Sequence, residues 1–154
     1  MTAAPDGDGH VLHLTRVFDA PIRFLFDCFT DPALIMQWWG PPGTLCPAAT
    51  SELRTGGTYR FVIEDPESGD RYISCGRYLV IEPPNRLVFT WYWEADPEAV
   101  TRVSVDFRAV DDLHTELTLK HARFPELASA KSHETGWTSS LTRLARLLSR
   151  SQTS

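Results

Sequence analysis

The order of apolar and polar residues predicts a strand, two short helices, six further strands and a long helix. Residues 10–18 have the length and β-branched content of a strand, and apolar residues 22–29 then recur at helical spacing. Asp31-Pro32 starts a second short helix, which the prolines and glycines of residues 40–43 terminate. The chain therefore begins with a strand followed by two short helices.

From residue 44 the pattern changes to short strands separated by turn-forming residues. After a first strand that ends near Gly56-Gly57, strands are expected at 58–64, 71–81, 86–94, 100–110 and 114–121. Gly76 interrupts the second of these, which indicates a bulge or a bend. Consecutive strands joined by short turns predict an antiparallel meander with one face in water.

The inner face of this sheet needs a cover, and residues 133–149 are the long candidate. Trp137, Leu141, Leu144 and Leu148 step by four, three and four, which places them on one stripe of a helix. Full burial of each side chain contributes about 1.5–3 kcal/mol. The predicted fold is α+β, with a curved antiparallel sheet covered by this helix. Residues 10–150 are expected to form one domain behind a disordered tail, 1–9.

Composition limits the partners. The chain has 154 residues, 42% of them hydrophobic, and a formal net charge of −5. No basic face marks a nucleic-acid partner, because Arg143, Arg146 and Arg150 fit the solvated side of the last helix. No apolar run approaches the ~18 residues of a membrane span, so no membrane insertion is expected.

The cysteines favour a cytoplasmic location. Cys28, Cys46 and Cys75 are odd in number, widely spaced and free of a CxxC pattern. Reduced thiols are the simplest account of such cysteines. The N-terminal residues lack a basic start followed by an apolar run, so no signal peptide is expected.

Several short motifs occur in a specific order along residues 10–149. They are Trp38-Trp39-Gly40-Pro41, Arg54-Thr55-Gly56-Gly57, Gly76-Arg77-Tyr78, Pro83 to Trp91, Thr115 to Leu119 with His121, and Gly136-Trp137. In order and spacing they resemble the START-like (SRPBCC) superfamily, in its Aha-type branch of homologues of an activator of a heat-shock-protein ATPase. The resemblance implies a helix-grip fold with a cavity between sheet and helix, which across the superfamily holds apolar molecules.

The residues expected to line such a cavity lie on the inner sheet face, on the last helix and at the Trp38-Trp39 pair. They are Trp38, Trp39, Tyr59, Phe61, Phe89, Trp91, Val105, Leu119, His121, Trp137 and Leu141. Trp38 and Trp39 are adjacent, so one is expected in the core and the other at a pocket mouth. For His121 a buried histidine bonded to backbone and a polar handle for a ligand both stay open.

The sequence predicts no catalytic residue, metal site or cofactor. His133-Glu134 does not continue as HExxH, because position 137 is Trp. Cys28 lies on an apolar helix face, where buried thiols are inert, and no GxSxG motif occurs.

Three functions follow in order of preference. The first is non-catalytic binding of a small, mostly apolar molecule between sheet and helix. The second is a cyclase-like or hydrolase-like enzyme in the same pocket, with His121 as general acid or base. The third is a protein-interaction role, with a chaperone partner or as a homodimer through a sheet edge or the tryptophan pair.

Overall fold

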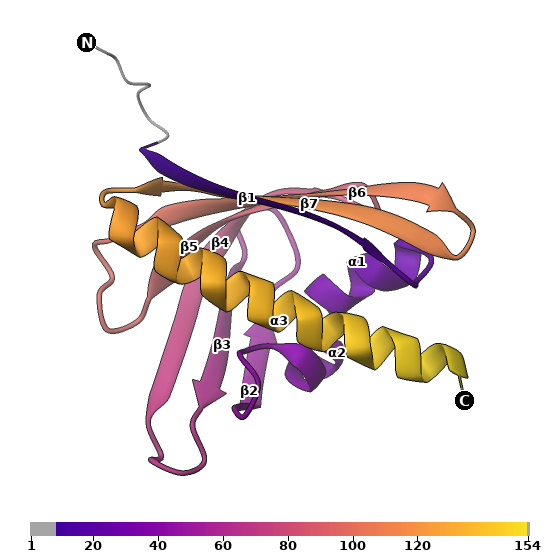
Figure 1. The fold of residues 1–154 in the computed structure, drawn as a ribbon. Helices are drawn as coiled ribbons and strands as arrows, with labels where there is room; N and C mark the ends of the chain where they lie inside the picture. Colours follow the sequence, from indigo (N-terminus) through magenta and orange to yellow (C-terminus); the bar gives the residue numbers. More distant parts are fainter. Residues whose placement is uncertain (1–8, 154) are drawn as a thin grey trace.

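A seven-stranded antiparallel sheet curves around one long helix (Figure 1). The computed structural model describes residues 9–153; the expected tail therefore lies outside the described residues, apart from Gly9, which forms a bridge with Phe124. The elements in chain order are β1 (His10–Phe18), α1 (Ile22–Thr30), α2 (Pro32–Trp38), β2 (Leu45–Ser51), β3 (Thr58–Glu64), β4 (Arg71–Glu82), β5 (Arg86–Trp93), β6 (Thr101–Asp111), β7 (His114–Phe124) and α3 (Leu127–Thr153).

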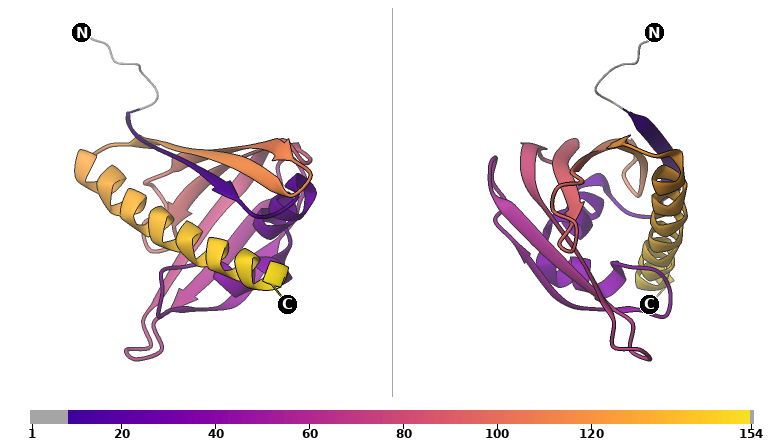
Figure 2. Two further views of the ribbon diagram at one scale, coloured as in Figure 1. Left: turned by 45° about the vertical axis from the view of Figure 1, so that its right-hand side comes forward. Right: turned by 90° about the vertical axis from the view of Figure 1, so that its left-hand side faces the viewer.

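The strand order is β1-β7-β6-β5-β4-β3-β2. Strands β2 to β7 therefore each pair with the next strand in the sequence, and β1 pairs with β7. All ladders between these strands are antiparallel. The predicted order of elements and the α+β class are confirmed. The sheet bends so that α3 lies across its concave side, while α1 and α2 fill one end of the interior (Figure 2).

The apolar stripe of α3 forms much of the core. Trp137, Leu141, Leu144 and Leu148 are all at most 5% exposed. The helix starts at Leu127, six residues before the expected start at His133, and Ala130 extends its buried side by two turns. The pattern of large apolar residues begins only at Trp137, so periodicity alone placed the start too late.

Gly76 allows a close approach between neighbouring strands and does not form a bulge. The ladder between β3 and β4 is regular through the pair Tyr59–Gly76, and the register shift between β4 and β5 falls between Tyr78 and Val80. A Cβ at Gly76 would lie 1.9 Å from the Thr90 carbonyl oxygen and 2.6 Å from the Tyr59 ring. Of the two expected alternatives, a bulge or a bend, the bulge at Gly76 is therefore wrong, and the glycine is needed for space.

Gly76→Ala is expected to lower the free energy of unfolding by about 1–3 kcal/mol or more, because the new methyl group overlaps backbone that cannot move independently. Urea denaturation followed by circular dichroism measures the loss. Gly69→Ala tests a glycine of a different kind, since its Cβ meets nothing within 4 Å and its φ of +78° strains any other residue. A Gly76→Ala protein as stable as the parent would contradict the close approach.

Candidate functional site

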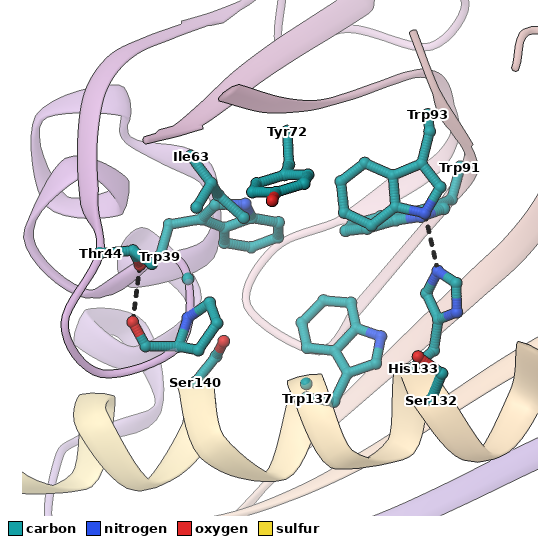
Figure 3. A pocket seen from close by; sticks show the side chains of 13 residues that line it. Trp39, Thr44, Ile63, Tyr72, Trp91, Trp93, Ser132, His133, Trp137 and Ser140 are labelled. Atoms are coloured by element: carbon teal, nitrogen blue, oxygen red, sulfur yellow. Dashed lines mark hydrogen bonds between the residues drawn. The ribbon is translucent and has the colours of Figure 1, made fainter. Parts of the chain in front are cut away.

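A cavity of about 300 Å³ lies between α3, the end of β3, the start of β4, the end of β5 and the loop after α2 (Figure 3). Its wall is mostly apolar and includes four tryptophans and a tyrosine. The lining residues are Trp39, Gly40, Pro41, Thr44, Ile63, Tyr72, Trp91, Trp93, Ser132, His133, Gly136, Trp137 and Ser140. None of these side chains carries a carboxylate, an ammonium or a guanidinium group. The cavity is therefore an uncharged, apolar space with a few hydroxyl groups at its border.

Local periodicity explains which side chains face it. In β5, Trp91 and Trp93 are two residues apart and so point to the same face of the sheet. In α3, His133 and Trp137 are four apart, and Gly136 and Ser140 repeat the same step beside them. The strand supplies the upper wall in Figure 3 and the helix supplies the lower one. Trp39 closes the side nearest α2, with its ring 5.5 Å from that of Trp137.

Gly136 leaves part of this space open. A Cβ built on it would meet no atom within 4 Å, and its φ is not in the left-handed region. A glycine inside a helix costs about 1 kcal/mol relative to alanine. Neither backbone conformation nor close packing requires glycine here. What its missing side chain does is enlarge the cavity.

His121 sits behind the cavity wall in a fixed, neutral state. It is fully buried, and its Nδ1 accepts a hydrogen bond from Trp137 Nε1 at 3.0 Å. Because an indole N–H can only donate, the proton of His121 is on Nε2, which lies 2.7 Å from Thr101 Oγ1. Thr101 in turn donates to the Trp91 carbonyl oxygen at 3.0 Å. Burial, with a smaller contribution from His133, lowers the pKa of His121 to about 2.

His133 is held in the complementary tautomer at the cavity wall. Its Nε2 accepts from Trp93 Nε1 at 3.1 Å, so Nδ1 carries the proton and donates to the Ser129 carbonyl oxygen at 2.9 Å. Burial lowers the pKa of His133, and the bond to Ser129 opposes that shift. The two imidazole rings are 5.3 Å apart. Both histidines are neutral, and in each the unprotonated ring nitrogen accepts a hydrogen bond from a tryptophan N–H group.

Trp91 differs from Trp93 and Trp137, whose indole N–H groups each donate to a histidine. Its Nε1–H is buried and has no acceptor among the described residues. An unpaired buried donor costs about 1–3 kcal/mol. The ring itself packs against Trp39, Trp93 and Trp137 at centroid distances of 5.9, 5.4 and 5.5 Å. The cavity wall thus holds an unpaired donor within an aromatic cluster.

The structure brings only some of the expected pocket residues to this cavity. Trp39, Trp91 and Trp137 line it. Tyr59, Phe61 and Phe89 line, with Trp39, a separate void of about 10 Å³, which is room for about one water molecule. Trp38, Val105, Leu119, His121 and Leu141 line neither space.

Their burial explains this placement. Trp38 is fully buried and its Nε1 donates to the Cys28 carbonyl oxygen, so Trp39 is the member of the pair at the cavity. Trp137 covers His121. Val105, Leu119 and Leu141 pack together in the core cluster.

Sequence reasoning missed ten of the wall residues, and the four that shape the argument are Trp93, His133, Gly136 and Tyr72. A signal existed for three of them. Trp93 continues the alternation of Trp91, His133 continues the helix stripe one turn before Trp137, and Gly136 is an unexplained glycine inside a helix. Tyr72 is 52% exposed at the cavity's edge and had no such signal.

The Cys28 thiol lies outside the cavity and is held in its neutral form. Burial raises the pKa of the Cys28 thiol to about 12, with Asp27 and Asp31 adding to the shift. Within residues 9–153, no three or more His, Cys, Asp or Glu side chains are grouped so that they could hold a metal ion. No helix of that part of the chain is long and apolar enough to cross a membrane.

A curved sheet gripping a C-terminal helix over an aromatic cavity defines a helix-grip domain. Residues 19–149 match the family model described as activator of Hsp90 ATPase homolog 1-like protein, and the chain belongs to that family. This confirms the START-like, Aha-type resemblance. No curated protein sequence matches the chain.

Solved structures agree with this assignment. A protein of the same family from Silicibacter pomeroyi is 32% identical, with a TM-score of 0.81 over 92% of this chain and 99% of that one. A protein from Rhodobacter sphaeroides is 27% identical, with a TM-score of 0.80 over 95% and 96%. An HSP90 activator from Plasmodium falciparum is 25% identical, with a TM-score of 0.59 over 76% and 75%.

Proposed function

We propose that this domain binds a small, mostly apolar molecule in the aromatic cavity and does not catalyse its conversion. The observation that carries the proposal is the cavity of about 300 Å³ that Gly136 leaves open between the indoles of Trp137 and Trp93. That volume is at the lower end of the range of ligand pockets, about 300–1,000 Å³. Aromatic walls with a few hydroxyl groups suit an uncharged ligand.

The two histidines favour binding over catalysis. A general base needs a free lone pair within hydrogen-bond reach of the substrate. His121 Nδ1 and His133 Nε2 both accept from tryptophan N–H groups, and His121 has no exposed surface. The pKa of His121, at about 2, also lies far from the value that suits acid–base work near neutral pH.

Filling the cavity from the helix tests the proposal. Gly136→Leu places a side chain where a Cβ meets no atom within 4 Å, so it should reduce affinity for a neutral fluorescent probe, N-phenyl-1-naphthylamine, by about tenfold or more. The same change should not destabilise the fold, because leucine favours helix over glycine by roughly 0.5–1 kcal/mol. Fluorescence titration measures the affinity and thermal unfolding the stability.

Thr138→Leu is the matched control, because it adds a leucine to an exposed position of the same helix. It should leave probe affinity unchanged. Equal probe affinity in Gly136→Leu and the parent protein would contradict binding in this cavity. So would failure of the parent to bind the probe together with native mass spectra that show no bound species.

A second candidate is binding to a chaperone of the Hsp90 type. Its support is the family to which the chain belongs and the likeness to the Plasmodium falciparum HSP90 activator. Such a partner, like a cytoplasmic location, also fits three buried cysteines that form no disulfide. Stimulation of the ATPase of purified Hsp90 by this chain would support the contact, and an unchanged rate would contradict it. The other expected protein contact, a homodimer, is tested by the molar mass that light scattering gives for the chain in solution.

A further inference from the structure

A second, open groove lies on the other side of α3, between that helix and β1. It has a volume of about 660 Å³, and three of its lining residues are arginines: Arg16, Arg143 and Arg146. The remaining lining residues are Thr142, Ala145 and Ser149. None of the six is acidic. The chain as a whole carries a net charge of −5, so the charge of this groove is opposite in sign to that of the protein.

Arg16 occupies an unusual position for a charged residue. Alternation along β1 places it on the inner face with Leu14 and Phe18, and it pairs across the ladder with the buried Leu117. Its Nη1 donates to Thr142 Oγ1 at 3.0 Å, and its guanidinium lies 5.7 Å from the centre of the Phe18 ring. These contacts fix the side chain at the groove without neutralising its charge.

Six arginines elsewhere on the surface are paired with carboxylates. The pairs are Arg23–Asp27, Arg54–Glu52, Arg60–Glu94, Arg71–Glu64, Arg86–Asp106 and Arg108–Glu116, all with N···O distances of 4.0 Å or less. In the described part of the chain, no carboxylate makes such a pair with Arg16, Arg143 or Arg146. Arg143 instead makes long bonds of 3.4 Å to the Gly40 and Pro41 carbonyl oxygens. One carboxylate, that of Asp19, reaches the end of the groove by accepting from Ser149 at 3.4 Å.

We propose that this groove, which we call the arginine groove, binds an extended acidic segment of a partner protein. Guanidinium groups bind carboxylates through paired N–H donors, and the groove offers three of them that make no ion pair with a carboxylate of the described residues. Arg143 and Arg146 are one helical turn apart and Arg16 faces them from β1, so the charges are spread along the groove. A chain with several carboxylates contacts all three, whereas a single small anion contacts fewer.

Nucleic acid is a poorer match for the same surface. Binding to a phosphate backbone is dominated by long-range attraction, and it is typical of domains with a basic face and a high isoelectric point. This chain has an isoelectric point of about 5.5. A local, short acidic segment can be attracted to three arginines while the rest of the surface repels a polyanion.

The test uses a fluorescein-labelled oligo-glutamate peptide, with an oligo-glutamine peptide of equal length as the uncharged control. We expect anisotropy titrations at low salt to show binding of the first peptide only, with affinity falling as salt rises. Arg16→Gln/Arg146→Gln should weaken that binding by about 5- to 10-fold. Arg143 is left intact in this variant because its contacts reach the loop that borders the aromatic cavity.

The matched control is Arg54→Gln/Arg108→Gln, which removes the same charge from other surfaces. It should change peptide affinity by less than about twofold. Arg146→Gln alone, at an exposed position, repeats the test without touching the Arg16–Thr142 bond. No binding of the acidic peptide, or equal weakening by both double variants, would overturn the proposal. Tighter binding of a labelled oligouridylate with the same arginine dependence would overturn the assignment to a peptide. None of these outcomes depends on the aromatic cavity.

Discussion

Acidification from pH 6.5 to pH 4.5 is expected to lower the free energy of unfolding by about 2–3 kcal/mol through His121 alone. The pKa of this residue is about 2 in the folded chain and near its ordinary value of 6.5 when unfolded. Between these values the unfolded chain binds more protons than the folded one, so stability falls as pH falls. Each pH unit in that window costs up to about 1.4 kcal/mol. His133, whose pKa is also lowered, adds a loss of the same sign.

Urea denaturation at several pH values between 7 and 4.5, followed by circular dichroism, measures this loss. His121→Phe removes the titrating group, so this variant should be less stable at pH 7 but show a flatter dependence on pH. His114→Gln is the matched control. The pKa of His114 is raised, mainly by its hydrogen bond to Asp111, so its contribution to stability has the opposite pH dependence. Parallel pH profiles for the parent and His121→Phe would contradict the origin assigned to the acid loss.

Local periodicity predicted the elements because strands and helices here carry their own patterns. The alternation along residues 58–64 and the stripe Trp137, Leu141, Leu144 and Leu148 depend only on neighbours in the chain. The structure confirms both elements. Gly76 shows the limit, because an interrupting glycine has the same sequence signature whether it makes a bulge or a close approach to Thr90.

The position of the cavity could not be read in the same way. The sequence pointed to a gap among Trp137, Leu119 and His121, but Trp137 and His121 are joined by a hydrogen bond there. The open space lies instead toward Trp93 and His133. Which side of the stripe stays empty depends on how α3 is placed across the sheet and on the rotamers of large rings. Both are long-range properties that no local pattern encodes.

Trp137 joins the core to the cavity, and its replacement should have the largest effect on stability of any change at the site. Trp137→Ala is expected to cost about 3–5 kcal/mol, the range for a large aromatic residue lost from a core. Part of that cost comes from losing the hydrogen bond from Trp137 Nε1 to His121, because the loss leaves Nδ1 of a fully buried histidine without a donor. Trp137→Phe keeps a ring and removes the donor, and should cost about 1–3 kcal/mol.

The second tryptophan–histidine pair provides the matched control for this bond. Trp93→Phe removes the donor to His133, but this pair is only partly buried and borders the cavity, so water can replace the lost bond. Its cost should be below about 1 kcal/mol. A double-mutant cycle of Trp137→Phe with His121→Phe, measured by urea denaturation, isolates the energy of the buried pair. If the two single Trp→Phe changes cost the same, or the cycle gives no coupling energy, then the fixed tautomer of His121 does not stabilise the wall of the cavity, and shape alone positions Trp137.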